Sequence, residues 1–138
     1  MSVKFYFEDI IPFRLPKRDL KKWFNSTVEN ENKKIGDIVY ILCSDAYLLQ
    51  INREFLNHDY LTDIITFDYV DEDTISGDIF ISYERVMDNS SIYNVSVQNE
   101  LLRVMIHGIL HLIGFKDKTV EELNIIRKKE DFYISMFK

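Results

Sequence analysis

The feature that most constrains the fold is a run of apolar residues near the carboxyl end in which polar residues recur only at every fourth position. Between residues 101 and 113 every residue is apolar or glycine except Arg103, His107 and His111. These three residues are four apart, so they lie along one side of a helix. A helix that is apolar almost all round belongs in a core, and its polar side must face a cleft or buried partners. The sequence therefore predicts a buried central helix over residues 97–113.

The two histidines of this helix are candidate metal ligands. Side chains four apart on a helix have Cβ atoms about 6 Å apart, so both imidazoles can reach one ion through bonds of about 2.1 Å. Two histidines alone make half a metal site. For each of them, the alternative is a histidine that is satisfied by hydrogen bonds in the core or in a cleft.

The residues after the second histidine extend the pattern to HxxxHxxGxxD. Gly114 can take a left-handed backbone conformation, which would end the helix and turn the chain. That turn can bring Asp117 to the ion as a third ligand of hard oxygen type. Three protein ligands leave the fourth position open for water, as in catalytic zinc sites. We therefore predict a zinc centre formed by His107, His111 and Asp117.

The same spacing is similar to HExxHxxGxxH, the pattern of the metzincin metallopeptidases, with one important change. Those enzymes use the glutamate after the first histidine as a general base. This chain has Gly108 at that position. A glycine in the middle of a helix costs about 1 kcal/mol relative to alanine, which indicates that something approaches the backbone closely there. The peptidase hypothesis therefore loses its base.

The remaining periodicities predict one α+β domain over residues 1–138, with a small mixed sheet of about four strands packed against helices. The central helix carrying HxxxH makes the expected arrangement zincin-like. Ser96 is the expected N-cap of that helix. Strands are expected at residues 3–7, 38–43, 63–69 and 75–82, and helices at residues 17–30, about 45–55, 83–90, 97–113 and 120–137.

Bulk composition limits the partners and the compartment. The net charge of −6 argues against a simple nucleic-acid binder, although residues 14–34 contain a local run of lysine and arginine. The start of the chain lacks the pattern of a signal peptide, and no run approaches eighteen apolar residues. A single cysteine, Cys43, is consistent with a reducing compartment. We expect a cytoplasmic protein that does not bind a membrane.

Three motifs, in the same order along the chain, resemble those of the YbeY family. The members of this family are bacterial metal-dependent endoribonucleases. The first is HGILHLIGF over residues 107–115, similar to the family's HGxLHLxGY. The second is NREFLNHDYLTDIITF over residues 52–67, and the third is GDIFIS over residues 77–82. The resemblance implies zinc-dependent, single-strand cleavage of RNA in ribosomal RNA maturation, including the 3′ end of 16S rRNA, and in ribosome quality control. It also implies ribosomal RNA and the small subunit or its assembly factors as partners.

The chain departs from the family pattern at two positions. The family's third histidine ligand falls on Asp117, which keeps a metal site but makes the identity of the metal less certain. An arginine that the family is thought to use near the scissile phosphate falls on Leu56. Its cationic role is then absent or moved, with Arg53 and Arg103 as the candidates.

The resemblance also implies that the metal lies in a cleft beside the GDI strand. Asp63 and Asp78 are then candidates for that cleft, where a carboxylate could orient a ligand histidine. We expect His107, His111, Arg103 and Asp78 to be catalytic. For the two aspartates, the alternative is hydrogen bonding in a turn or at a strand edge. His58 is a poorer substitute for Asp117.

Two alternatives to an endoribonuclease stay open. The first is a ribosome-associated binding factor whose metal is structural, which the acidic net charge and Leu56 favour. The second is a zinc peptidase, which Gly108 disfavours. Arg103 could contact a substrate phosphate, or it could form an ion pair with Glu100 or another acid.

Overall fold

The computed structural model describes residues 2–57 and 62–137, and within these ranges it contains four strands and five helices. The strands are β1 (Ser2–Glu8), β2 (Lys34–Cys43), β3 (Ile64–Asp68) and β4 (Thr74–Ser82). The helices are α1 (Lys17–Asn30), α2 (Asp45–Leu56), α3 (Tyr83–Ile92), α4 (Val97–Ile113) and α5 (Val120–Met136). The predicted order of strands and helices is confirmed.

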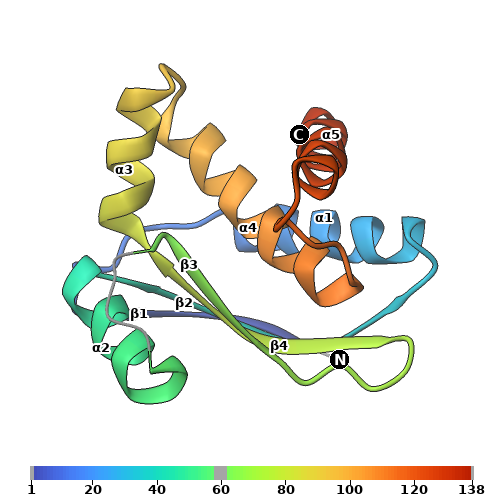
Figure 1. The fold of residues 1–138 in the computed structure, drawn as a ribbon, viewed down its shortest axis with the longest axis horizontal. Helices are drawn as coiled ribbons and strands as arrows, with labels where there is room; N and C mark the ends of the chain where they lie inside the picture. Colours follow the sequence, from blue (N-terminus) through green and yellow to red (C-terminus); the bar gives the residue numbers. More distant parts are fainter. Residues whose placement is uncertain (1, 58–61, 138) are drawn as a thin grey trace.

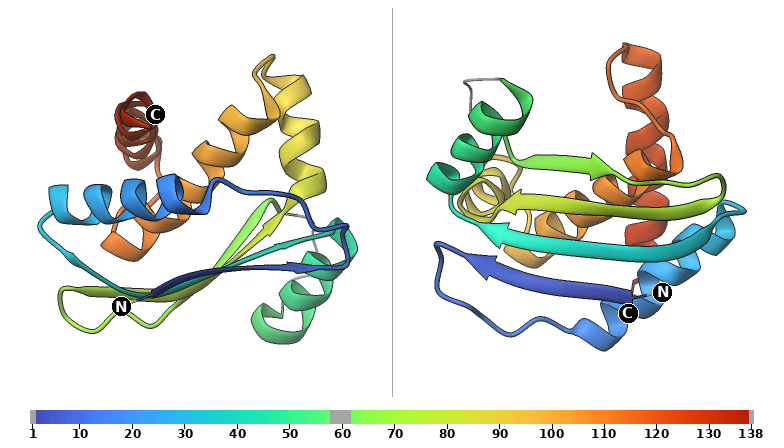
Figure 2. Two further views of the ribbon diagram at one scale, coloured as in Figure 1. Left: turned by 180° about the vertical axis from the view of Figure 1, so that it is seen from behind. Right: turned by 90° about the horizontal axis from the view of Figure 1, so that it is seen from below.

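The four strands form one mixed sheet in the order β1-β2-β4-β3 (Figure 2). β1, β2 and β4 run parallel, and β3 is antiparallel to β4. The two parallel connections pass through helices, as parallel pairing requires. β2 begins four residues before the predicted strand, and its pairing with β4 shifts register between Ile35 and Ile38.

Helices cover the two faces of the sheet unequally (Figure 1). α1, α4 and α5 lie on one face, and α2 lies on the other. The main core fills the space between β2, β4 and the first group of helices. A smaller apolar cluster beneath α2 contains Cys43, Leu48 and Ile65. The α+β domain with a helix-packed mixed sheet is therefore confirmed.

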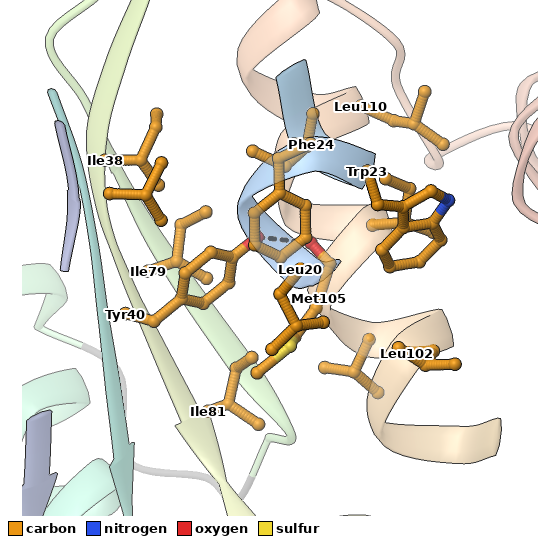
Figure 3. Close-up of a cluster of buried hydrophobic side chains, with 14 of the residues drawn as sticks. Leu20, Trp23, Phe24, Ile38, Tyr40, Ile79, Ile81, Leu102, Met105 and Leu110 are labelled. Carbon is orange, nitrogen blue, oxygen red and sulfur yellow. Dashed lines mark hydrogen bonds between the residues drawn. The ribbon is translucent and has the colours of Figure 1, made fainter. Parts of the chain in front are cut away.

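The main core is built from inward-facing strand residues and two helices (Figure 3). Ile79 and Ile81 of β4 are fully buried, as are Phe24 of α1 and Met105 of α4. Each such side chain contributes about 1.5–3 kcal/mol relative to leaving it in water. The hydroxyl of Tyr40 donates to the carbonyl of Met105 over 2.8 Å, so this buried polar group is satisfied.

Local sequence signals explain the bounds of α4, which are those that the sequence predicts. The hydroxyl of Ser96 accepts from the backbone N–H of Asn99 and caps the helix. Gly114 ends the helix with φ of 124°. The helix contacts both β3 and β4 on the main-core face of the sheet. Its central position, expected from the apolar run, is confirmed.

No helix in the described ranges is both long and apolar enough to span a membrane.

Candidate metal centre

Three side chains bring their donor atoms together at the carboxyl end of α4. Nε2 of His107 and Nε2 of His111 are 2.9 Å apart. Oδ2 of Asp117 lies 3.3 Å from each of these nitrogens. The three atoms therefore form a nearly equilateral triangle, partly open to solvent, and the predicted residues do meet.

The triangle fits a small divalent cation. A tetrahedral ion with bonds of about 2.0–2.1 Å requires donors roughly 3.3–3.4 Å apart. Two imidazole nitrogens and one carboxylate oxygen are also ligands that zinc accepts. Three donors occupy one face of the tetrahedron, so a fourth position would face away from the protein. His107, His111 and Asp117 are thus able to hold a metal ion.

Glu130 of α5 fixes the orientation of His107. Its Oε2 lies 2.5 Å from Nδ1 of His107, and the glutamate is fully buried. A proton on Nδ1 that is donated to this carboxylate leaves the lone pair on Nε2, directed at the triangle. The spacing of residues in the sequence does not predict Glu130, since it lies nineteen residues beyond His111 in another helix.

The two imidazoles have opposite electrostatic environments. Burial lowers the pKa of His107, but the hydrogen bond and charge of Glu130 and the charge of Asp117 outweigh it, so the pKa is raised overall. Burial and the neighbouring His107 lower the pKa of His111. His107 is therefore the group that takes up a proton first when no metal is bound.

Arg103 continues the polar line of α4, and acids of α5 hold it. Its guanidinium donates to Glu130 over 2.9 Å and to Asp131 over 2.6 Å. Of the two roles predicted for Arg103, the ion pair is therefore formed, with Glu130 and Asp131 in place of Glu100. Arg103 also borders the pocket beside the metal centre.

A backbone turn carries Asp117 to the histidines. The N–H of Gly114 and the N–H of Phe115 both bond the carbonyl of Leu110, which closes the end of α4. The positive φ of Gly114 lets the chain reverse there. Asp117 follows three residues later and before Thr119, the N-cap of α5.

A pocket of about 530 Å³, part of it open to solvent, adjoins the metal centre. It lies between α3, α4, α5 and the start of β3. His107 and Asp117 border one end, and Asp63 is also part of its wall, as the family resemblance implies for the cleft. Asp63 is half-buried and is close enough to contribute to the pKa values of His107 and Glu100.

Asp78 lies on the other face of the sheet. Side chains alternate along β4, so Gly77 and Ile79 face α4 while Asp78 points toward the side that α2 partly covers. Its carboxylate accepts a 3.3 Å hydrogen bond from the hydroxyl of Tyr69. The structure therefore does not bring Asp78 to the metal centre, and the strand hydrogen bonding considered as its alternative is what is observed.

The remaining predicted residues lie outside the triangle. Leu56 is partly exposed at the end of α2, on the opposite face of the sheet. Arg53 belongs to the same helix. His58 lies outside the described residues.

The fold and the three donors together define a class of protein, namely an α+β domain with a two-histidine, one-carboxylate candidate metal site on its central helix. The family described as Endoribonuclease YbeY matches residues 8–138. A protein of Cytophaga hutchinsonii named Endoribonuclease YbeY is 47% identical over 136 residues, which cover 97% of this chain and 95% of that one. Another of that name from Flavobacterium johnsoniae is 53% identical over 115 residues, 83% of each chain.

Among solved structures, the solution structure of TM1509 from Thermotoga maritima is similar, with a TM-score of 0.68 and 28% identity. The match covers 97% of this chain and 87% of that chain. This chain belongs to the Endoribonuclease YbeY family.

Proposed function

We propose that this protein is a zinc-dependent endoribonuclease that cleaves single-stranded ribosomal RNA precursors during maturation of the small ribosomal subunit. The observation that carries the proposal is the triangle of His107, His111 and Asp117 in a chain of this family. Family membership supports RNA as the substrate, and the donor set supports zinc. A ribosomal substrate places the reaction in the cytoplasm.

A bound divalent ion would supply positive charge for the phosphate and acidify a coordinated water. The chain's own residues prepare that chemistry. Glu130 holds the ring of His107 and keeps its proton on Nδ1. Asp117 adds one negative charge to the two neutral imidazoles. Arg127 stands half-exposed at the wall of the pocket, where its guanidinium can meet a phosphate.

The charge of the pocket supports a requirement for metal in RNA binding. Two arginines border the pocket, Arg103 and Arg127. Four acids also border it, namely Asp63, Glu100, Asp117 and Glu130. Without a cation this excess of negative charge repels a phosphate. A divalent ion would bring the formal charge of these groups from −2 to neutral.

The peptidase alternative is disfavoured by the surroundings of residue 108. A Cβ added to Gly108 would lie 3.0 Å from Ile79 and 3.1 Å from Ile64. This position therefore faces the packed sheet rather than the pocket, so a glutamate there could not act as the metzincin base does. The structural-metal alternative is also weaker, since a closed structural site uses four protein ligands.

The decisive experiment compares wild-type protein with His111→Ala and Asp117→Ala. Zinc content and cleavage of a labelled ribosomal RNA precursor are measured for each. We expect about one zinc per wild-type chain, and loss of both zinc and cleavage in the two variants. The control Glu121→Ala alters an exposed acid of α5 away from the site and should keep both. Bound zinc without RNA cleavage would instead favour the binding factor, and absence of zinc would refute the proposal.

A further inference from the structure

The pocket beside the metal centre is long enough to hold more than a phosphate. The pocket encloses about 150 Å³, which is below the range of roughly 300–1,000 Å³ typical of small-molecule sites, so a nucleotide bound there would remain partly in solvent. Glu100 and His107 both border it and are seven residues apart on α4, which is about 10.5 Å along a helix. That span resembles the reach of one nucleotide from its phosphate to the far edge of its base.

Glu100 is an unusual residue for the far end of this pocket. It is only 4% exposed, yet no side chain in residues 2–57 and 62–137 donates a hydrogen bond to its carboxylate. The nearby guanidinium of Arg103 bonds Glu130 and Asp131 instead. Burial raises the pKa of Glu100, with the charge of Arg103 acting in the opposite direction. Glu100 borders the pocket, and no side-chain polar atom in the described ranges is both fully buried and without a hydrogen-bond partner, so its carboxylate oxygens face the pocket, where a ligand can donate to them.

Two further groups at this end have the chemistry that recognises a base. Asn89 of α3 is half-buried, and its amide has no hydrogen-bond partner among the residues that the structure describes. An amide offers both a donor and an acceptor. Tyr93, which follows α3, is 59% exposed and presents an aromatic ring on which an unstacked base can lie. Figure 1 shows α3 beside the amino-terminal half of α4, and Asn89, Tyr93 and Glu100 all line the pocket.

We propose that Glu100, Asn89 and Tyr93 form a nucleobase subsite that prefers guanine in the nucleotide next to the scissile phosphate. The inference rests on the proposed function, because it assumes that the metal end of the pocket takes that phosphate. The base of the bound nucleotide then extends along α4 toward Glu100. Arg127, in the wall of the pocket, lies beside the sugar and phosphate of that nucleotide.

The donor pattern of the bases selects guanine. An ionised carboxylate only accepts hydrogen bonds. Guanine presents two adjacent N–H donors, at N1 and at the 2-amino group, that match its two oxygens. Adenine and cytosine each place a ring acceptor beside the amino group, and uracil has one N–H between two carbonyls. In these three bases an acceptor would face Glu100, and one bidentate pair is worth about 1–3 kcal/mol of discrimination.

The test titrates zinc-loaded protein and metal-free protein with the four nucleoside monophosphates and with inosine monophosphate, by calorimetry or NMR. We expect guanosine monophosphate to bind about tenfold more tightly than the others. Inosine monophosphate, which lacks the 2-amino group, should lose most of this preference. Glu100→Gln should abolish it, and the matched control Glu121→Gln on the surface of α5 should keep it. Tyr93→Leu should weaken every nucleotide to a similar extent.

The outcomes separate the subsite from the proposed function. Equal affinity for all bases, a preference for another base, or a guanine preference that survives Glu100→Gln would overturn the subsite. These titrations need no turnover, so they are informative even for an inactive protein. Zinc content and RNA cleavage test the function independently, and a zinc-loaded, RNA-cleaving protein without base preference would refute the subsite alone.

Discussion

At the residue scale, the candidate centre depends as much on Glu130 as on the three donors. The carboxylate of Glu130 is fully buried and accepts hydrogen bonds from both His107 and Arg103. It therefore orients a metal ligand and neutralises a partly buried cation with one group. Asp131, the other acceptor of Arg103, is mostly exposed and touches neither histidine.

Replacing Glu130 with glutamine tests this role. The amide oxygen can still accept a hydrogen bond, but the negative charge that favours the Nδ1 proton is lost. We expect zinc affinity to fall about 10–100-fold, the usual cost of removing a partner of a metal ligand. The control Asp131→Asn removes only the outer acceptor of Arg103 and should leave zinc affinity unchanged. Competition against a chromogenic chelator measures both, and equal losses in the two variants would contradict the assignment.

The site residues that the sequence predicts are those that lie close together along the chain. His107, His111 and Asp117 lie within eleven residues, so helix geometry and one glycine turn relate them. Glu130 reaches His107 only because α5 packs on α4, and no spacing in the sequence encodes that contact. The expectation that Asp78 lies in the metal cleft is wrong, because side chains alternate along β4 and Asp78 is on the other face of the sheet. Both faces of that strand carry apolar side chains, and the pattern alone did not show which face meets α4.

At the element scale, Gly114 connects the end of α4 to the position of Asp117. Its φ of 124° is strained for any other residue, while an added Cβ would meet no atom within 4 Å. Gly114→Ala thus acts through the backbone alone, and it should cost about 1–2 kcal/mol of unfolding free energy. Zinc affinity should fall too, because relief of the strain moves Asp117. Urea unfolding in EDTA and zinc titration measure the two effects, and Lys118→Ala in the same loop should change neither.

Gly108 has a different role, since it lets α4 approach the sheet closely. The hypothetical Cβ contacts to Ile79 and Ile64 leave no room for a branched side chain. Gly108→Val should therefore destabilise the fold by about 1–3 kcal/mol through overpacking. Gly108→Ala should cost less, because its single methyl group needs only a small shift of these isoleucines and alanine favours the helix. Denaturant midpoints compare the two, and equal stability of the valine variant and the wild type would refute close packing at this point.

At the scale of the whole molecule, a group of cations on α1 lies apart from the acidic pocket. Exposed lysines and arginines occupy the solvent side of α1: Lys17, Arg18, Lys21 and Lys22. The acidic pocket borders α3, α4, α5 and the start of β3, whereas α1 packs on β2. The net charge of −6 therefore says little about the site itself, where a bound cation would offset the excess acid. The strand and helix order was predictable because each element has a clear period, whereas this distribution of charge needed the topology.

The pH dependence of stability that His107 causes above pH 6.5 should disappear when zinc is bound. Without metal, His107 has a pKa raised above its unfolded value of about 6.5, because Glu130 and Asp117 outweigh the effect of burial. The protonated His107 therefore adds to the free energy of unfolding. This addition is fully present below about pH 6.5 and is lost as the pH rises through the raised pKa. Zinc needs the neutral imidazole, so the stability that zinc adds grows over the same range. Urea midpoints above pH 6.5 should therefore fall in EDTA and level off in excess zinc, because the growing zinc contribution offsets the loss. Glu130→Gln should flatten the fall in EDTA, and parallel slopes with and without zinc would show that His107 is not a ligand.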